Sequence, residues 1–293
     1  MKKYIWWFIK NIFPLLIGLF LVYYSYSNTT IDDRQEIYNS FKNADYRYIS
    51  LSVFLLVLSH FSRAYRWKYL LNPMGFNISF SNSIMAVLVG FLSNLSIPRS
   101  GEFLRASIIT LYEKIPFEKG FGTIITERII DVIILLICIL VGISIFPLIE
   151  RPALSFNLIS IIFFCIIIFI IYMIFKFFLE KTHIGYKIKN FISDIKKGVF
   201  SIFYMPKKEK FIIHTLFIWT MYFLMIYVVK FSIPETSSLN FEAIFSAFIA
   251  GAIAMSLTNG GIGVYPLAIA GVVNQYDVSY ENALALGWII WTS

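Results

Sequence analysis

The sequence predicts an all-α, polytopic membrane protein that forms a single transmembrane domain over residues 1–293. Hydrophobic residues make up 58% of the chain and its mean hydropathy is +0.75, whereas soluble domains are about 45–50% apolar. Charged residues make up only 14%, against about 25% in soluble proteins. Apolar runs of about 20 residues, the length that crosses a bilayer as a helix, recur along the chain. Together these observations exclude a soluble fold.

Five runs have the composition of membrane-spanning helices, at residues 5–26, 48–71, 121–146, 154–178 and 211–232. The first follows two lysines, as a signal sequence would, but it has no clear A-x-A cleavage site. We therefore interpret it as an uncleaved first helix. The chain stops inside the apolar run "ALALGWIIWTS", which predicts a last helix that is cut short.

Two further segments are apolar but interrupted. Residues 80–112 are broken at "SIPRSGE", and residues 241–274 are broken at "LTNGGIGVYP". The positive-inside rule orients them. With a cytoplasmic N-terminus in the plasma membrane, a segment 80–112 that returns to its own side places the basic loop 179–210 in the cytoplasm. In the same orientation the cluster of Arg63, Arg66 and Lys68 lies on the cytoplasmic side.

The basic loop has two interpretations. Its lysines alternate with apolar residues at roughly helical spacing, which is typical of an amphipathic helix on an anionic leaflet. A solvated positive-inside loop would have the same composition. Either interpretation assigns the net charge of +8 to the membrane surface, so we do not expect nucleic acid as a partner.

The second interrupted segment then enters from the opposite side. The two breaks can be compared, because each follows a glycine, Gly90 or Gly251, by about eight residues. The two interrupted segments are therefore compatible with an inverted repeat. Paired interrupted segments of this kind indicate a substrate site near the middle of the membrane.

The residues at the breaks favour an anion site. Freed backbone groups must be satisfied inside the protein or against a water-filled cavity. Pro98 cannot continue a helix, and the helix that follows a break presents free N–H groups that attract anions. Arg99 and Arg105 add positive charge beside the first break. The alternative is a kinked helix whose polar residues face the headgroups.

The next predicted span, 121–146, carries Glu127, Arg128 and Asp131 near its start. An unpaired charge at the bilayer centre costs about 2.5–3.5 kcal/mol on insertion scales. The charges of the three arginines and three carboxylates in this part of the chain sum to zero; they are Arg99, Arg105, Arg128, Glu102, Glu127 and Asp131. We therefore expect a buried network in which Arg99 or Arg105 pairs with Glu127 or Asp131. A purely structural network is the alternative. The candidate substrate-binding residues are Asn94, Pro98, Arg99, Gly101, Glu102, Arg105, Glu127, Arg128, Asp131, Asn259, Gly260, Gly261 and Gly263.

"NLSIPRSGEFLRA", then "ITERIIDVIIL" and later "TNGGIGVYPLA" together resemble the lysylphosphatidylglycerol synthase transmembrane, or flippase-like, family. The resemblance covers about residues 5 to 293. It implies a plasma-membrane protein with two re-entrant segments that moves lipids between leaflets. Two departures are the contiguous Pro98-Arg99 pair and residues 264–266, where many members have a glutamate. The chain has no soluble aminoacyl-transferase domain, so lipid aminoacylation is not expected.

The leading functional prediction is a flippase for an anionic or polyprenyl-phosphate lipid. There is no G-x-x-x-x-G-K-[ST] motif, and no G-x-S-x-G, H-E-x-x-H or Cys/His cluster, so we expect no catalytic residues, metal or cofactor. The alternatives are a membrane-embedded transferase acting on lipid-linked substrates and a non-catalytic partner subunit. The expected partners are membrane lipids with anionic headgroups, and a homo-oligomer or a partner enzyme is left open.

Overall fold

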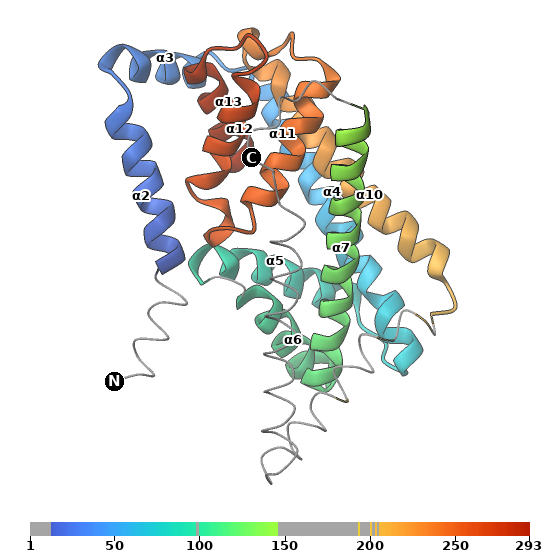
Figure 1. Ribbon diagram of the computed structural model, residues 1–293. Helices are drawn as coiled ribbons and strands as arrows, with labels where there is room; N and C mark the ends of the chain where they lie inside the picture. Colours follow the sequence, from blue (N-terminus) through green and yellow to red (C-terminus); the bar gives the residue numbers. More distant parts are fainter. Residues whose placement is uncertain (1–12, 98–99, 146–192, 194–199, 201–202, 204) are drawn as a thin grey trace, which may run out of the picture.

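The computed structural model describes residues 13–97, 100–145, 193, 200, 203 and 205–293 (Figure 1). Within these residues every regular element is helical and no β-strand occurs. Three helical stretches, Tyr46–Met74, Phe117–Ile145 and Lys208–Ser232, are long and apolar enough to cross a membrane. The predicted class, a polytopic helical membrane protein, is therefore confirmed.

Three long helices form the frame of the molecule. α4 (Tyr46–Leu71) runs downward in Figure 1, whereas α7 (Phe117–Ile145) and α10 (Lys208–Val229) run upward. α4 and α10 pack against each other as an antiparallel pair. We call the end where α4 finishes and α7 begins the α6 end, and the opposite one the α3 end.

The two interrupted segments form two helical hairpins. α5 (Phe80–Ser96) and α6 (Ser100–Glu113) lie at the α6 end. α11 (Phe241–Ala254), the short turn η5 (Asn259–Gly261) and α12 (Val264–Val273) begin and finish at the α3 end (Figure 1). Both predicted interruptions are therefore present. The first hairpin lies across the molecule with its α5 arm nearly perpendicular to the long helices, and the second enters from the α3 end with its turn toward α5 (Figure 1).

A glycine lets the two arms of each hairpin approach closely. A Cβ atom on Gly90 would lie 2.8 Å from Cγ of Arg105 and 3.1 Å from the carbonyl oxygen of Gly101. A Cβ atom on Gly251 would lie 2.8 Å from the ring of Tyr265 on the other arm. The two glycines compared in the sequence thus have the same packing role in their respective hairpins.

Polar caps fix where the helices begin. Asn240 accepts from the backbone N–H of Ala243 at 2.8 Å and starts α11. Ser79 and Ser279 cap α5 and α13 (Tyr280–Thr292) in the same way. These are residues whose side chains accept from the free N–H groups of a first turn. Short polar side chains therefore mark the helix starts between the apolar runs.

The α3 end carries a helix that the sequence did not predict. Between the predicted spans 5–26 and 48–71 lies α3 (Ile31–Lys42), which begins with a capping box between Thr30 and Asp33. Glu36 accepts from the side-chain amide of Asn282 at 2.9 Å, and Ser40 donates to Asn282 at 2.6 Å. These bonds fasten α3 across the start of α13.

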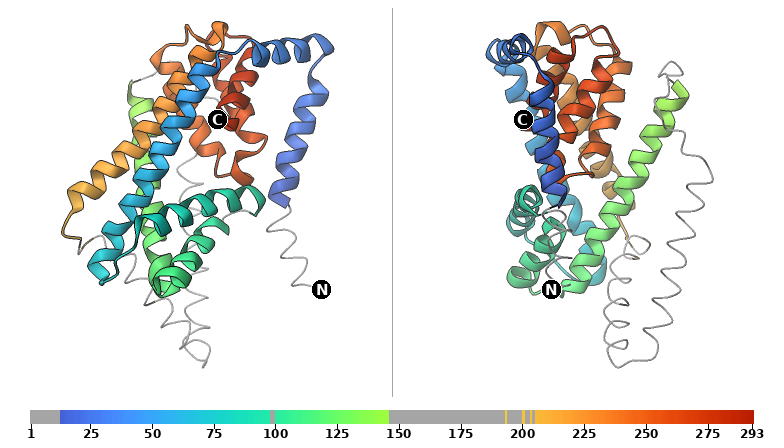
Figure 2. Two further views of the ribbon diagram at one scale, coloured as in Figure 1. Left: turned by 180° about the vertical axis from the view of Figure 1, so that it is seen from behind. Right: turned by 60° about the vertical axis from the view of Figure 1, so that its left-hand side comes forward.

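The first helix, α2 (Phe13–Asn28), stands beside the bundle (Figure 2). Its contact with the η5 turn is made through Gly18, where a Cβ atom would lie 2.8 Å from the carbonyl oxygen of Ile262. The main apolar core lies elsewhere, among α10 to α13, and includes Ile226, Ile244, Ile269 and Leu286.

The predicted span 154–178 lies outside the described residues, as do Pro98, Arg99 and most of the predicted basic loop 179–210.

Candidate functional site

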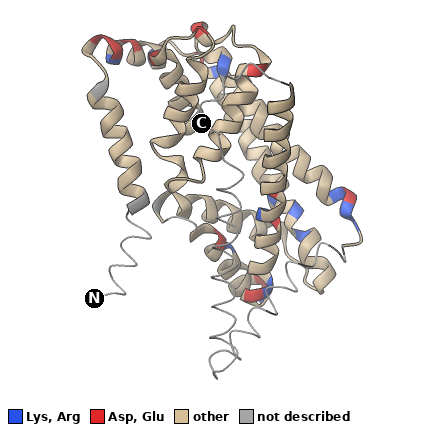
Figure 3. Ribbon diagram, in the orientation of Figure 1, with Lys and Arg blue, Asp and Glu red and all other residues tan. Residues whose placement is uncertain are grey.

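Charged residues occur on α4, α6 and α7 where these helices meet (Figure 3), and ion pairs join their side chains. Arg63 and Arg66 are three residues apart on α4, and Glu127 and Asp131 are four apart on α7. Residues at these spacings share one face of a helix. The two pairs consequently face each other across the α4–α7 contact. Glu127 lies ten residues after the start of α7, or about 15 Å along the helix axis.

Ion pairs join the two helices. Arg63 Nη1 lies 3.1 Å from Asp131 Oδ2. Arg66 reaches both carboxylates, with Nη1 3.4 Å from Asp131 Oδ1 and Nη2 3.5 Å from Glu127 Oε1. α10 contributes two hydroxyl acceptors: Arg66 donates to Thr215 at 2.8 Å, and Arg63 donates to Tyr222 at 3.2 Å. Two helices, α7 and α10, therefore hold the two arginines of α4.

Arg105 brings the first hairpin into the network. Its Nη1 lies 2.9 Å from Glu127 Oε2, which confirms the predicted pairing of Arg105 with a carboxylate of this helix. Its guanidinium also lies 4.3 Å from the ring of Trp67, whose indole N–H donates to Thr123 at 2.8 Å. Nε and Nη2 of Arg105 are buried and make no hydrogen bond with the described residues. The guanidinium thus retains donors that an anion could use.

Arg128 lies at the edge of the network. Its Nε is 3.0 Å from Glu102 Oε1 on α6, and its Nη1 is 3.7 Å from Asp131 Oδ2. The Arg128 side chain is 39% exposed, whereas those of Arg63, Arg66 and Arg105 are at most 3% exposed. Arg128 is the arginine through which the network reaches the molecular surface.

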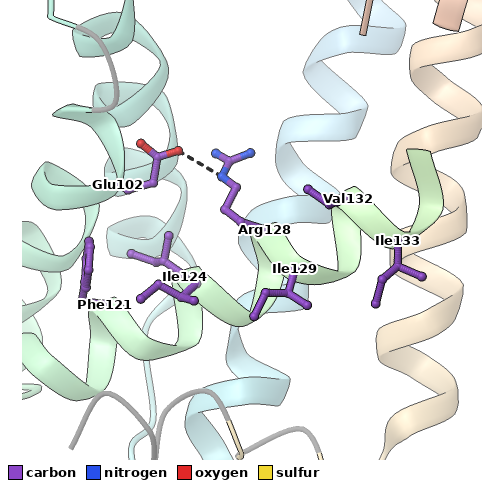
Figure 4. Close-up of a pocket in the computed structure, with 8 residues that line it drawn as sticks. Glu102, Phe121, Ile124, Arg128, Ile129, Val132 and Ile133 are labelled. Atoms are coloured by element: carbon purple, nitrogen blue, oxygen red, sulfur yellow. Dashed lines mark ion pairs between the residues drawn. The ribbon is translucent and has the colours of Figure 1, made fainter. Parts of the chain in front are cut away.

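A groove opens beside this pair, with a volume of about 340 Å³ (Figure 4). Glu102 and Arg128 face one another along one side. Six apolar side chains complete the lining: Phe121, Ile124, Ile125, Ile129, Val132 and Ile133. The groove is therefore an apolar surface with one ion pair at its edge.

The charge of the network corrects the sequence prediction. Among the described residues four arginines share three carboxylates, which leaves one positive charge in excess. The prediction of a neutral network was wrong because it left out Arg63 and Arg66, which were assigned to the cytoplasmic surface. Both are buried, with relative exposures of 2% and 0%. Lys68, from the same predicted cluster, is half-buried.

The glycine turn lies away from the ion pairs. Gly260, Gly261 and Gly263 have φ of +57°, +78° and +73°, values that an L-residue rarely adopts. The buried Asn259 opens the turn, and Trp291 donates to the Gly260 carbonyl at 2.7 Å. None of the ion pairs formed by described residues reaches the turn. A Cβ atom on Gly260 would lie 2.6 Å from a methyl group of Leu95 on α5, so the turn meets the first hairpin.

Two other predicted residues hold the first hairpin together. Asn94 accepts from the backbone N–H of Gly101 at 2.8 Å, and Gly101 packs against Gly90. The structure thus brings together Glu102, Arg105, Glu127, Arg128 and Asp131. It gives Asn94 and Gly101 a structural position, and it leaves Pro98 and Arg99 outside the described residues. No group of three His, Cys, Asp or Glu side chains within the described ranges could hold a metal ion.

Comparison with known proteins identifies one matching family and one similar protein. The family model described as "Lysylphosphatidylglycerol synthase TM region" matches residues 11–290. A UPF0104 membrane protein of Methanocaldococcus jannaschii is 32% identical over 136 residues, which are 45% of this chain and 40% of that protein. The chain therefore aligns with two fifths of that relative's length. No solved structure matches the chain.

Proposed function

Because the chain belongs to the family of lysylphosphatidylglycerol synthase transmembrane regions, we propose that it moves an anionic or polyprenyl-phosphate lipid between the leaflets of the plasma membrane. Its partners in this proposal are membrane lipids with anionic headgroups, and its N-terminus is cytoplasmic. The family and the long apolar helices establish the coarser statement, that the protein is an integral membrane protein.

The excess positive charge in the buried network is the observation that supports lipid movement. Ionisable residues inside a membrane protein face its interior or a water-filled cavity and mark substrate pathways. A network used only to join helices would be most stable with its charges balanced, since an uncompensated buried charge is costly. Four arginines with three carboxylates are instead suited to receive an anion such as a lipid phosphate.

The fold supplies a surrounding suited to such a headgroup. The network is enclosed by apolar helices, and the second hairpin meets the first near Leu95. Arginine binds phosphate through a planar fork of donors, and Arg105 keeps buried donors without hydrogen bonds to the described residues. The headgroup would cross through the polar interior while its acyl chains stay in the bilayer.

Reconstitution tests the proposal. The full chain is placed in liposomes that contain a trace of fluorescent phosphatidylglycerol or phosphatidylcholine, and the outer-leaflet label is bleached with dithionite. We expect the protein to make inner-leaflet phosphatidylglycerol accessible within minutes and phosphatidylcholine much more slowly. Equal, protein-independent rates for both lipids would contradict the proposal.

Two further measurements sharpen the result. Arg105→Lys keeps the charge but loses the planar fork, so it should slow transport while the protein remains folded. Mass spectrometry of the recovered lipids separates movement from chemistry, because a transferase changes the mass of the lipid and a flippase does not.

A further inference from the structure

The groove between α6 and α7 has the shape and composition of a surface that meets lipid. On its α7 side Ile129, Val132 and Ile133 are 45%, 55% and 45% exposed. α7 is one of the helices long and apolar enough to cross a membrane, so these exposed side chains are suited to contact with acyl chains. Glu102 and Arg128 form an ion pair at the edge of this apolar surface (Figure 4).

We propose that this groove binds one membrane phospholipid whose headgroup carries a net negative charge, with its phosphate at Arg128 while one acyl chain follows the apolar lining of α7. The inference rests on the proposed function, because it assigns the lateral route by which a lipid reaches the arginine network. It makes Arg128 the first headgroup contact and Glu102 the residue that tunes the affinity of that contact.

Charge complementarity favours an anionic occupant. Arg128 meets Glu102 through Nε and Asp131 through Nη1, and a guanidinium has five N–H donors, so donors remain for a phosphate. Asp131 is shared with Arg63 and Arg66, so it cannot fully neutralise Arg128. The excess positive charge of the network is thus presented to the membrane at Arg128, the most exposed of its four arginines.

The apolar lining favours a lipid over a soluble anion. A free phosphate would use the guanidinium alone and would gain nothing from Ile129 or Val132. An acyl chain buries apolar surface along the groove in addition to the phosphate contact. The neighbouring Arg105 and Glu127 then lie further inside, where a headgroup that leaves Arg128 would be received.

Competitive lipid binding tests this assignment. The detergent-solubilised full chain is incubated with equimolar phosphatidylglycerol and phosphatidylcholine, and bound lipid is identified by native mass spectrometry. The wild type should retain phosphatidylglycerol preferentially. Arg128→Gln should lower that preference roughly tenfold, the effect of losing one charge-assisted hydrogen bond. Glu102→Gln should raise it, because the amide no longer competes for Arg128.

A matched pair of tryptophan variants tests the acyl-chain part. Ile129→Trp fills the groove and should lower the retention of phosphatidylglycerol several-fold. Ile137→Trp adds the same side chain on α7 at a residue of similar exposure, 49%, that does not line the groove, and it should leave retention unchanged. If Arg128→Gln does not fold, Glu102→Gln and the tryptophan pair still decide the question.

Three outcomes would overturn the inference. One is unchanged lipid preference in folded Arg128→Gln. Another is equal retention in Ile129→Trp and Ile137→Trp. The third is full displacement of phosphatidylglycerol by millimolar inorganic phosphate, which would indicate a soluble-anion site. If the wild type transports lipid and Ile129→Trp changes neither transport nor binding, the proposed lipid site in the groove is wrong but the proposed flippase function stands. If lipid binds in the groove but is not transported, the proposed flippase function is wrong but the proposed lipid site stands.

Discussion

At the scale of single residues, Arg66 illustrates how a full charge is kept inside an apolar bundle. Its side chain is completely buried, and the isolated cost of such a charge would be several kcal/mol. Glu127, Asp131 and the hydroxyl of Thr215 together surround the guanidinium. Removal of one carboxylate therefore affects several arginines at once.

Glu127 is a completely buried member of this network and pairs with both Arg66 and Arg105. We expect Glu127→Gln to destabilise the protein by about 3–5 kcal/mol, the usual loss when one partner of a buried pair is removed. Thermal unfolding in detergent measures the effect. The control is Glu209→Gln in the exposed first turn of α10, where a change within about 0.5 kcal/mol is expected. Equal melting temperatures for the two variants would contradict the structural role of Glu127.

Glu113 makes a different, pH-dependent contribution outside the membrane-spanning helices. Its Oε1 accepts from the backbone and hydroxyl of Ser79 and from the amide of Asn82, at 2.9, 2.7 and 2.7 Å. The hydrogen bond from the Ser79 side chain, with those from Asn82 and the Ser79 backbone, holds the pKa of Glu113 below its ordinary value.

A carboxylate with a lowered pKa stabilises the fold above its unfolded-state pKa, and that stability is lost as the pH falls through the folded-state pKa. The stability difference between wild type and Glu113→Gln should therefore be full at pH 7. It should shrink from about pH 4, the ordinary range for glutamate, downward. Melting temperatures of both proteins between pH 3 and pH 7 check this, and a difference that grows on acidification would contradict it.

At the scale of elements, the two hairpins differ in what holds them together. The first is joined by Asn94, Gly90 and Gly101 and carries the charges of α6. The second is formed by a turn with three glycines in the left-handed region. Backbone conformation, rather than charge, determines the second hairpin.

Gly263 is the critical glycine of that turn. Its φ is +73°, and a Cβ atom would lie 2.5 Å from the Gly18 carbonyl of α2. We expect Gly263→Ala to cost about 1–3 kcal/mol through backbone strain, and more through the clash with α2. Gly271 in α12 has open space around its Cβ position, so Gly271→Ala should be neutral or stabilise the protein by about 0.4–1 kcal/mol. Thermal unfolding compares the two variants. A lower melting temperature for Gly271→Ala than for Gly263→Ala would contradict a special role of the turn.

The elements were largely predictable from the sequence, and the network was not. A proline, or several glycines close together, interrupts an apolar helical pattern, so the interruptions after Ile97 and Leu257 are visible without a structure. Arg63 and Arg66 lie near the end of a predicted span, where a count of positive charge assigns them to the cytoplasm. Their three-residue spacing on one face was the available signal. Their partners on α7 are more than 60 positions away in the chain, and only the packing of α4 on α7 identifies them.

At the scale of the whole molecule, the hairpins enter from opposite ends and the termini of the long helices define two surfaces. α3 lies at one surface, and the first turn of α10 lies at the other (Figure 1). With a cytoplasmic N-terminus, α3 is external. Tyr38→Cys, at an exposed residue of α3, should then react with an impermeant maleimide in intact cells.

Lys208→Cys, at an exposed residue that begins α10, is the matched variant. It should react only after the cells are opened. Both variants are made in a chain whose Cys138 and Cys165 are replaced by serine. Labelling of both cysteines from the same side would contradict the arrangement of the long helices across the membrane.

The first hairpin contributes Glu102 and Arg105 to the arginine network and the second contributes none of its described ion pairs, and this asymmetry has an electrical consequence. Between Glu242 and Asp277 the second hairpin contains no charged residue, so nothing there neutralises an anion that leaves the arginines. A lipid that crosses from the network to the far leaflet therefore moves net negative charge through the membrane field. One elementary charge moved through 100 mV corresponds to about 2.3 kcal/mol. An interior-negative potential should consequently drive an anionic lipid outward. In vesicles, a potassium diffusion potential imposed with valinomycin should shift the final distribution of fluorescent phosphatidylglycerol between the leaflets. Reversing the sign of the potential should reverse that shift.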